Sequence, residues 1–166
     1  MAAGSTYTPI ATYTLPSAAA SYTFSSISGS YTDLILVGTA NNNQGVAYIS
    51  TLTFNADSGS NYSYIRMVGT GTAGSSSTDS GATYGYGGWS NNQSNQYNIS
   101  INHFQNYSNS TTYKTWLGQG GDVTDRVYFV TGVWRNTAAI TSISFNAAYG
   151  SFVSGSSFAL YGIKGG

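Results

Sequence analysis

The sequence predicts an all-β protein, a single antiparallel β-sandwich of jelly-roll-like type with roughly nine or ten short strands. First, the composition favours strands and turns over helices, with 15 Tyr and 21 Gly among 166 residues and abundant Ser, Thr and Asn. Second, short apolar segments recur at spacings of about 8 to 12 residues between turn-forming clusters. Third, several segments alternate apolar and polar residues, as strands with one buried side do.

The segment from Tyr31 to Gly69 predicts three strands joined by two loops rich in Asn, Gly, Asp and Ser. In the middle strand, Tyr48, Leu52 and Phe54 fall on one face, and Ile49, Thr51 and Thr53 fall on the other. This stretch is therefore interpreted as a sheet scaffold.

Two segments differ in composition from the rest of the chain, the first six residues and a Gly/Ser-rich stretch in the middle. Residues 1–6 are small and unpatterned and are predicted to form an arm, followed by a sandwich domain over residues 7–166. Tyr22 to Phe24 is expected to be the second strand. Residues 70–96 form a Gly/Ser-rich insertion, which predicts a long loop or short edge strands.

The second half of the chain adds further strands. Apolar residues alternate from Tyr97 to Ile101, and a short segment follows from Tyr113 to Leu117. Arg126 to Trp134 is the most apolar strand, expected to lie between neighbours with apolar side chains on both faces. Ala139 to Phe145 is interpreted as its antiparallel partner, and Phe158 to Ile163 as the last strand.

Charge and cysteine content narrow the function classes. Five Lys and Arg balance five Asp, only 6% of residues are charged, and cysteine is absent. The chain therefore offers no field that would attract nucleic acid or acidic lipid, and no disulfide framework. No apolar run approaches the roughly 20 residues of a membrane helix, and no signal peptide is recognised. A neutral chain with so few charges favours a surface covered in an assembly.

Candidate catalytic and metal-binding residues are few. His103 is the only histidine and is expected to be structural, since no nucleophile elbow accompanies it. Most of the five Asp residues sit in apparent turns. Asp122 and Asp125 could contribute to a calcium site or to a polysaccharide-cleaving pair, but a capped turn beside Arg126 explains them better. We expect no enzyme activity, no cofactor and no metal.

Residues 69–74, Gly-Thr-Gly-Thr-Ala-Gly, match the dinucleotide-binding fingerprint in letters only. The mechanism of that motif needs a helix directly after the glycines, and the Ser-rich sequence that follows does not predict one. A dinucleotide site is therefore rejected.

Tyr84, Tyr86 and Trp89 form the one constellation typical of binding. On a Gly-rich loop they would suit stacking on sugar rings, a protein interface, or anchoring of the loop itself. Trp116 and Trp134 lie outside that loop and are predicted to belong to the core.

Four segments carry a family resemblance: Tyr31–Leu36, Leu52–Ser63, Trp134–Thr137 and Leu160–Lys164. In these segments the chain resembles virion proteins of tailed bacteriophages, a group that includes capsid decoration proteins and parts of tail fibres. The resemblance implies a β-sandwich without catalysis, frequently a homotrimer.

We therefore expect a phage capsid decoration (cement) protein, a homotrimer on the virion head that binds the major capsid protein and stabilises the lattice. The alternative is a receptor- or glycan-binding module of a tail fibre, in which the three aromatic residues stack on sugar. No nucleic-acid or membrane partner is expected. The expected partner-binding residues are Ala2, Ala3, Ser5, Thr6 and Tyr7 of the arm, on the coat, and Tyr84, Tyr86 and Trp89, on a sister subunit.

Overall fold

The computed structural model describes residues 6–44, 48–90, 96–123 and 125–164. Within these ranges the chain forms twelve strands and no helix, so the all-β prediction is confirmed and the strand count is somewhat higher than predicted. The strands are β1 (Tyr7–Thr14), β2 (Ser21–Phe24), β3 (Asp33–Ala40), β4 (Tyr48–Phe54), β5 (Tyr62–Gly69), β6 (Gly74–Ala82), β7 (Gly85–Ser90), β8 (Asn98–Gln105), β9 (Lys114–Gly121), β10 (Val127–Trp134), β11 (Ile143–Ala147) and β12 (Ser157–Ile163).

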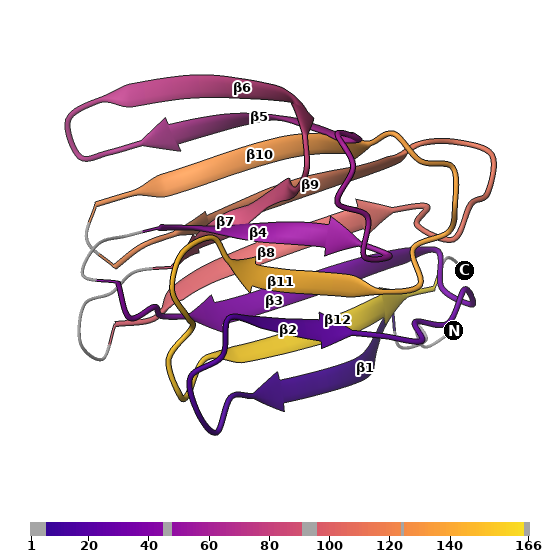
Figure 1. The fold of residues 1–166 in the computed structure, drawn as a ribbon, viewed down its shortest axis with the longest axis horizontal. Helices are drawn as coiled ribbons and strands as arrows, with labels where there is room; N and C mark the ends of the chain where they lie inside the picture. The colour runs from indigo at the N-terminus through magenta and orange to yellow at the C-terminus, as the bar shows by residue number, and fades with distance from the viewer. Residues whose placement is uncertain (1–5, 45–47, 91–95, 124, 165–166) are drawn as a thin grey trace, which may run out of the picture.

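Two antiparallel sheets pack face to face (Figure 1). The large sheet has eight strands in the order β1-β12-β3-β8-β9-β10-β5-β6, and the small sheet has four in the order β2-β11-β4-β7. Without β5, β6, β9 and β10, two four-stranded sheets remain, β1-β12-β3-β8 and β2-β11-β4-β7. That is the strand order of a jelly roll, in which the chain passes repeatedly from one sheet to the other.

The four additional strands are two hairpins inserted into this jelly roll. The β5–β6 hairpin lies between β4 and β7 in sequence, and the β9–β10 hairpin lies between β8 and β11. Because β9 pairs with β8 and β10 pairs with β5, both hairpins extend the large sheet past β8. In Figure 1, β5 and β6 lie beyond the edge of the small sheet. The insertions thus make the large sheet wider than its partner.

For the segment from Arg126 to Trp134, the predicted position in the sheet is confirmed and the predicted pairing partner is wrong. As β10 it lies between β9 and β5 and carries apolar side chains on both faces, which confirms the expectation. Its predicted partner is wrong, because β11 pairs with β2 and β4 in the small sheet. Because β5 and β9 already pair with the two edges of β10, the segment after Trp134 cannot pair with β10 as a hairpin. It crosses to the small sheet instead.

Residues 70–96 form edge strands, one of the two predicted outcomes. β6 is the last strand of the large sheet and β7 the last of the small sheet, while residues 91–95 lie outside the described ranges. Small polar residues suit β6, because an edge strand with few apolar side chains resists pairing with other chains.

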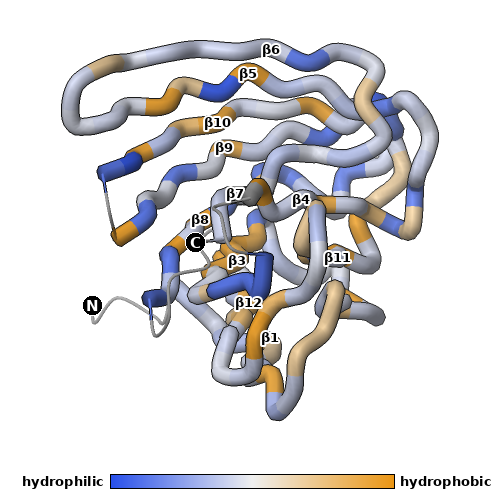
Figure 2. Tube along the Cα trace, turned by 60° about the vertical axis from the view of Figure 1, so that its left-hand side comes forward, coloured by the Kyte–Doolittle hydropathy of each residue, from blue (hydrophilic) through white to orange (hydrophobic). Residues whose placement is uncertain are grey.

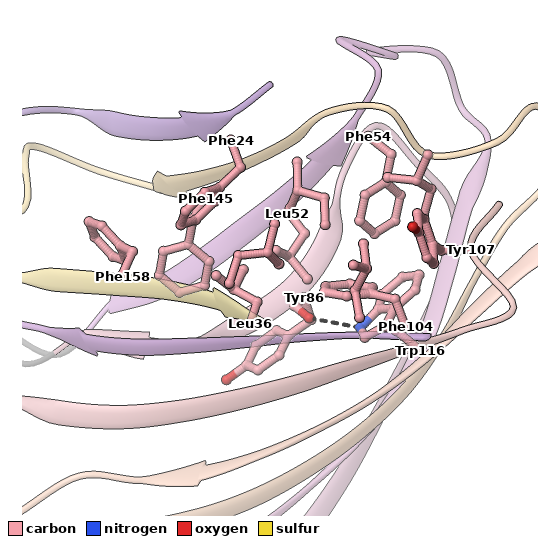
Figure 3. Packing of buried hydrophobic residues seen from close by; sticks show 14 of the residues in the cluster. Phe24, Leu36, Leu52, Phe54, Tyr86, Phe104, Tyr107, Trp116, Phe145 and Phe158 are labelled. Atoms are coloured by element: carbon pink, nitrogen blue, oxygen red, sulfur yellow. Dashed lines mark hydrogen bonds between the residues drawn. The ribbon is translucent and has the colours of Figure 1, made fainter. Parts of the chain in front are cut away.

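The core between the sheets is dominated by aromatic rings (Figure 3). Phe54 on β4 packs against Phe104, Trp116 and Trp134 of the large sheet, with ring centroids 5.5, 5.7 and 5.5 Å away. Both tryptophans are buried, as predicted. Each such side chain contributes about 1.5–3 kcal/mol to stability on burial.

Candidate interaction surface

The large sheet has an inner face, which meets the small sheet, and an outer face, which is bare over the described residues. On β8 the inner face carries Asn98, Ser100 and Asn102, all buried, whereas Ile99 and Ile101 point outward. The alternation predicted for this strand is therefore present, but its apolar side faces away from the sandwich.

The close approach of β7 explains why β8 and β9 place polar and small residues inward. A Cβ on Gly88 would lie 2.9 Å from the Cβ of Ser100 on β8, and one on Gly85 would lie 2.7 Å from the ring of Trp116 on β9. The Asn102 amide donates to the carbonyl of Gly87 at 2.9 Å, and the Trp116 indole donates to the carbonyl of Tyr86 at 3.1 Å. Large-sheet side chains thus satisfy carbonyl groups of the edge strand β7.

The outer face is mostly apolar along rows that run across neighbouring strands. Strand register places one row through Ile65, Thr131, Leu117, His103, Ile35 and Tyr161, on β5, β10, β9, β8, β3 and β12. The next row runs through Met67, Phe129, Gln119, Ile101, Val37 and Ala159 on the same strands. Hydrophobic positions recur along β5, β10 and β9 in Figure 2.

These outward side chains account for most of the exposed apolar surface of the described chain. Of its eleven exposed large apolar residues, seven lie on the outer face. They are Tyr7 (55%), Ile65 (50%), Met67 (57%), Ile99 (49%), Leu117 (51%), Val127 (57%) and Phe129 (54%). Single exposed apolar residues are normal on a protein surface, but a contiguous group of this size indicates an interaction site.

A groove of about 410 Å³ runs along the middle of the face. Its walls include Ile65, Met67, Ile101, Leu117 and Phe129, contributed by four adjacent strands. The polar groups in its lining are few, so it offers contact area for apolar side chains and little that would orient a polar ligand. We name the apolar residues of these rows and of the adjoining row through Val127 and Ile99, together with this groove, the outer apolar face.

Ionisable groups lie within and beside the outer apolar face: His103 stands in its first row, and Arg135 lines a neighbouring hollow with Ile65 and Thr131. Nε2 of His103 lies 3.0 Å from Oδ2 of Asp33, and Oδ1 of Asp33 accepts the backbone N–H of Asn106 at 2.8 Å. The pair ties the start of β3 to the turn after β8, in accord with the structural role expected for His103.

The predicted arm leads onto this face. Ala2, Ala3 and Ser5 lie outside the described residues, and Thr6 is exposed. Tyr7 begins β1 opposite Ile163 and lines the far end of the outer face with Ile35 and Tyr161. Of the predicted arm residues, Tyr7 thus joins the surface that the fold assembles.

The three aromatic residues of the insertion do not form an exposed platform, which corrects the loop interpretation. Tyr86 is fully buried on β7, Tyr84 and Trp89 are half-buried, and burial raises the pKa of Tyr86 above its ordinary value. The guanidinium carbons of Arg66 and Arg126 lie 5.9 and 5.2 Å from the centroid of the Trp89 ring, within the range of cation–π contact. The aromatics anchor the β5–β6 extension to the small sheet, one of the three roles considered for them.

The carboxylates of the β9–β10 turn cap the backbone. Oδ1 of Asp122 accepts the backbone N–H groups of Asp125 at 3.0 Å and of Arg126 at 3.1 Å, as the capped-turn prediction expects. In the part of the chain that the structure describes, no three acidic, His or Cys side chains converge as a metal site would require. Residues 69–74 form the tight turn of the β5–β6 hairpin, with Gly69 opposite Gly74 and no following helix.

Two of the four segments that carry the phage resemblance meet in one structural corner around Asp57. Oδ2 of Asp57 accepts the Trp134 indole N–H at 2.6 Å and the Asn61 amide at 2.9 Å, and Oδ1 accepts the Gly59 N–H at 2.8 Å. Desolvation raises the pKa of Asp57, but these hydrogen bonds and one from Asn136 outweigh it, so the pKa lies below its ordinary value. The corner joins the β4–β5 crossover to the end of β10.

Comparisons with protein-family models, with curated proteins and with solved structures find no match. Among the described residues there is also no helix with the length and apolar character needed to cross a membrane. The interpretation of the outer apolar face therefore depends on its own geometry.

Sequence reasoning missed Ile65, Met67, Leu117, Val127 and Phe129 as surface residues. A signal was present, because β5 and β10 both carry apolar residues at successive positions, which indicates two apolar faces. A fully buried central strand gives the same pattern, and only the position of the small sheet shows which face remains uncovered.

Proposed function

We propose that this protein is a non-enzymatic structural protein of a tailed-phage virion, a capsid decoration protein that forms a homotrimer on the head surface. The observation that carries this proposal is the outer apolar face. A contiguous apolar area of this kind is expected to be covered by protein in the working state of the molecule. A chain of which only 6% is charged has little else to keep such a face soluble.

In this role the protein would stabilise the capsid by binding to its assembled form. A decoration protein that contacts neighbouring major capsid protein subunits binds the assembled lattice and not its separated parts, so occupancy stabilises the lattice by mass action. The arm that leads onto the face at Tyr7 supplies a segment able to order on the coat.

The Asp57 corner gives independent support. The segments Leu52–Ser63 and Trp134–Thr137 are far apart in sequence, yet the structure joins them through the Asp57–Trp134 hydrogen bond. Residues on which the phage resemblance depends thus form one structural unit, as expected if they specify a shared sandwich. The support concerns the fold of that group and extends to function only as a proposal.

The test is immunogold electron microscopy of intact phage particles with an antibody raised against this chain. The expected result is label spread over the heads, and antibody pre-absorbed with the purified protein serves as the control. Label confined to tail tips would replace the proposal with the fibre alternative. Particles without label on head or tail would remove the virion assignment altogether.

A further inference from the structure

We infer that the outer apolar face is the surface through which copies of this chain associate with one another. The inference deepens the proposed function and rests on it for the view that this face works in an assembly. It assigns the occupant of the face to further copies of the same chain, and leaves the arm and the sheet edges to contact other proteins.

The size of the face matches what a stable association needs. Six of its residues, on β5, β8, β9 and β10, are each about half exposed. At about 100 Å² for each half-exposed large side chain, they present on the order of 600 Å². The half-buried Ile35, Val37, Ile101 and Tyr161 extend the same rows. The total approaches the roughly 800 Å² per partner of a standard stable interface.

The chemistry of the face favours a permanent partner. Interfaces between proteins that meet transiently are about as polar as the rest of the surface, whereas homo-oligomer interfaces are more apolar. The central rows contain Thr131, Gln119 and His103 as polar residues, and no Lys, Arg, Asp or Glu. A chain always meets its own copies at synthesis, so a second copy is the partner available for permanent cover.

Charge favours the same occupant. Two copies of one surface bring identical charges together, and like charges that face each other oppose association. Among Lys, Arg, His, Asp and Glu, the two central rows contain His103 alone, and its Nε2 lies 3.0 Å from Oδ2 of Asp33 at the start of β3. The two central rows carry no Lys, Arg, Asp or Glu, so few like charges oppose the approach of a second copy.

The groove provides a site for interdigitation. It lies beside Phe129, whose ring stands in the row between Met67 and Gln119 with 54% of its surface exposed. Apolar side chains of a second copy can enter the groove, and large aromatic residues at the centre of an interface commonly dominate its affinity. Phe129 is therefore the residue on which association depends most.

The experiment compares the mass of purified wild-type protein with that of Phe129→Lys, by size-exclusion chromatography with light scattering at roughly 10 µM, a concentration that resolves micromolar affinities. The control is Tyr149→Lys, which changes an aromatic residue of similar exposure (60%) in the loop after β11, outside the rows of the outer face. Wild type and Tyr149→Lys are expected at a multiple of 17.4 kDa, twice that mass if two faces meet across a two-fold axis and three times for a trimer. Phe129→Lys is expected as a monomer, its association weakened at least about 30-fold.

A second readout separates loss of association from loss of folding. The buried Trp116 and Trp134 give a near-ultraviolet circular dichroism signal, which must be unchanged in Phe129→Lys. If that variant unfolds, Leu117→Thr replaces it, because Thr suits an outward strand position. A monomeric wild type, or a folded face variant that associates as tightly as wild type, overturns the inference.

The two proposals fail in different measurements. A monomeric chain that still labels phage heads removes self-association through this face and keeps the decoration role. An oligomeric chain that labels no virion keeps the self-association and removes that role.

Discussion

Replacing Asp57 by Ala tests whether the corner that joins β4, β5 and β10 contributes substantially to stability. The substitution removes the acceptor of the Trp134 indole N–H, and Trp134 is fully buried. An unsatisfied buried donor costs about 1–3 kcal/mol. Loss of the turn-forming bond from Gly59 adds roughly 0.5–1 kcal/mol. We expect a loss of about 2–4 kcal/mol, or a decrease in Tm of about 4–16 °C for a chain of this length.

The assay is urea unfolding followed by tryptophan fluorescence. Asp125→Ala is the matched control, because its side chain is 55% exposed and its contact with Arg126 is a 3.9 Å surface pair. That variant should unfold within about 0.5 kcal/mol of wild type. The reasoning is refuted if Asp57→Ala is as stable as Asp125→Ala.

Acid titration of the same variants provides a second test. Because the pKa of Asp57 is lower in the folded protein than the value of about 3.9 in the unfolded chain, its ionised form stabilises the fold at every pH above about 4. This contribution is lost as the pH falls through the lower, folded pKa. The stability difference between wild type and Asp57→Ala should therefore narrow below about pH 4. A difference that is constant from neutral pH to the most acid conditions in which the protein stays folded would contradict this account of the corner.

Two further predictions concern the core. Gly132→Ala places a Cβ against the ring of Trp116 and should lower the free energy of unfolding in urea by about 1–3 kcal/mol. The loss should be smaller in a Trp116→Leu background, where the ring is absent. Equal losses in both backgrounds would contradict this account of the packing. Burial raises the pKa of Tyr62 to about 12 and also raises the pKa values of Tyr64 and Tyr128. The neutral form of these tyrosines contributes fully to stability below about pH 10, and the contribution is lost as the pH rises toward 12. The free energy of unfolding should therefore fall between about pH 10 and 12, and an increase over that range would contradict the prediction.

The sequence by itself determined the fold class and the positions of several strands. Period-two alternation and turn clusters located β2, β4, β8, β10 and β12, because both signals are local properties of the backbone. The same local chemistry correctly rejected a dinucleotide loop at residues 69–74. It also identified Trp116 and Trp134 as core residues.

Only the tertiary structure decided which strands pair and which side of each strand is covered. The segment after Trp134 has the alternation of a hairpin partner, but β5 returns from a distant part of the sequence to pair with β10. Likewise, Ile99 and Ile101 alternate as a buried face would, yet the glycines of β7 approach so closely that β8 turns its Asn and Ser residues inward. Strand pairing and sheet packing are contacts between residues remote in sequence, so the outer apolar face could not be located before the small sheet was placed.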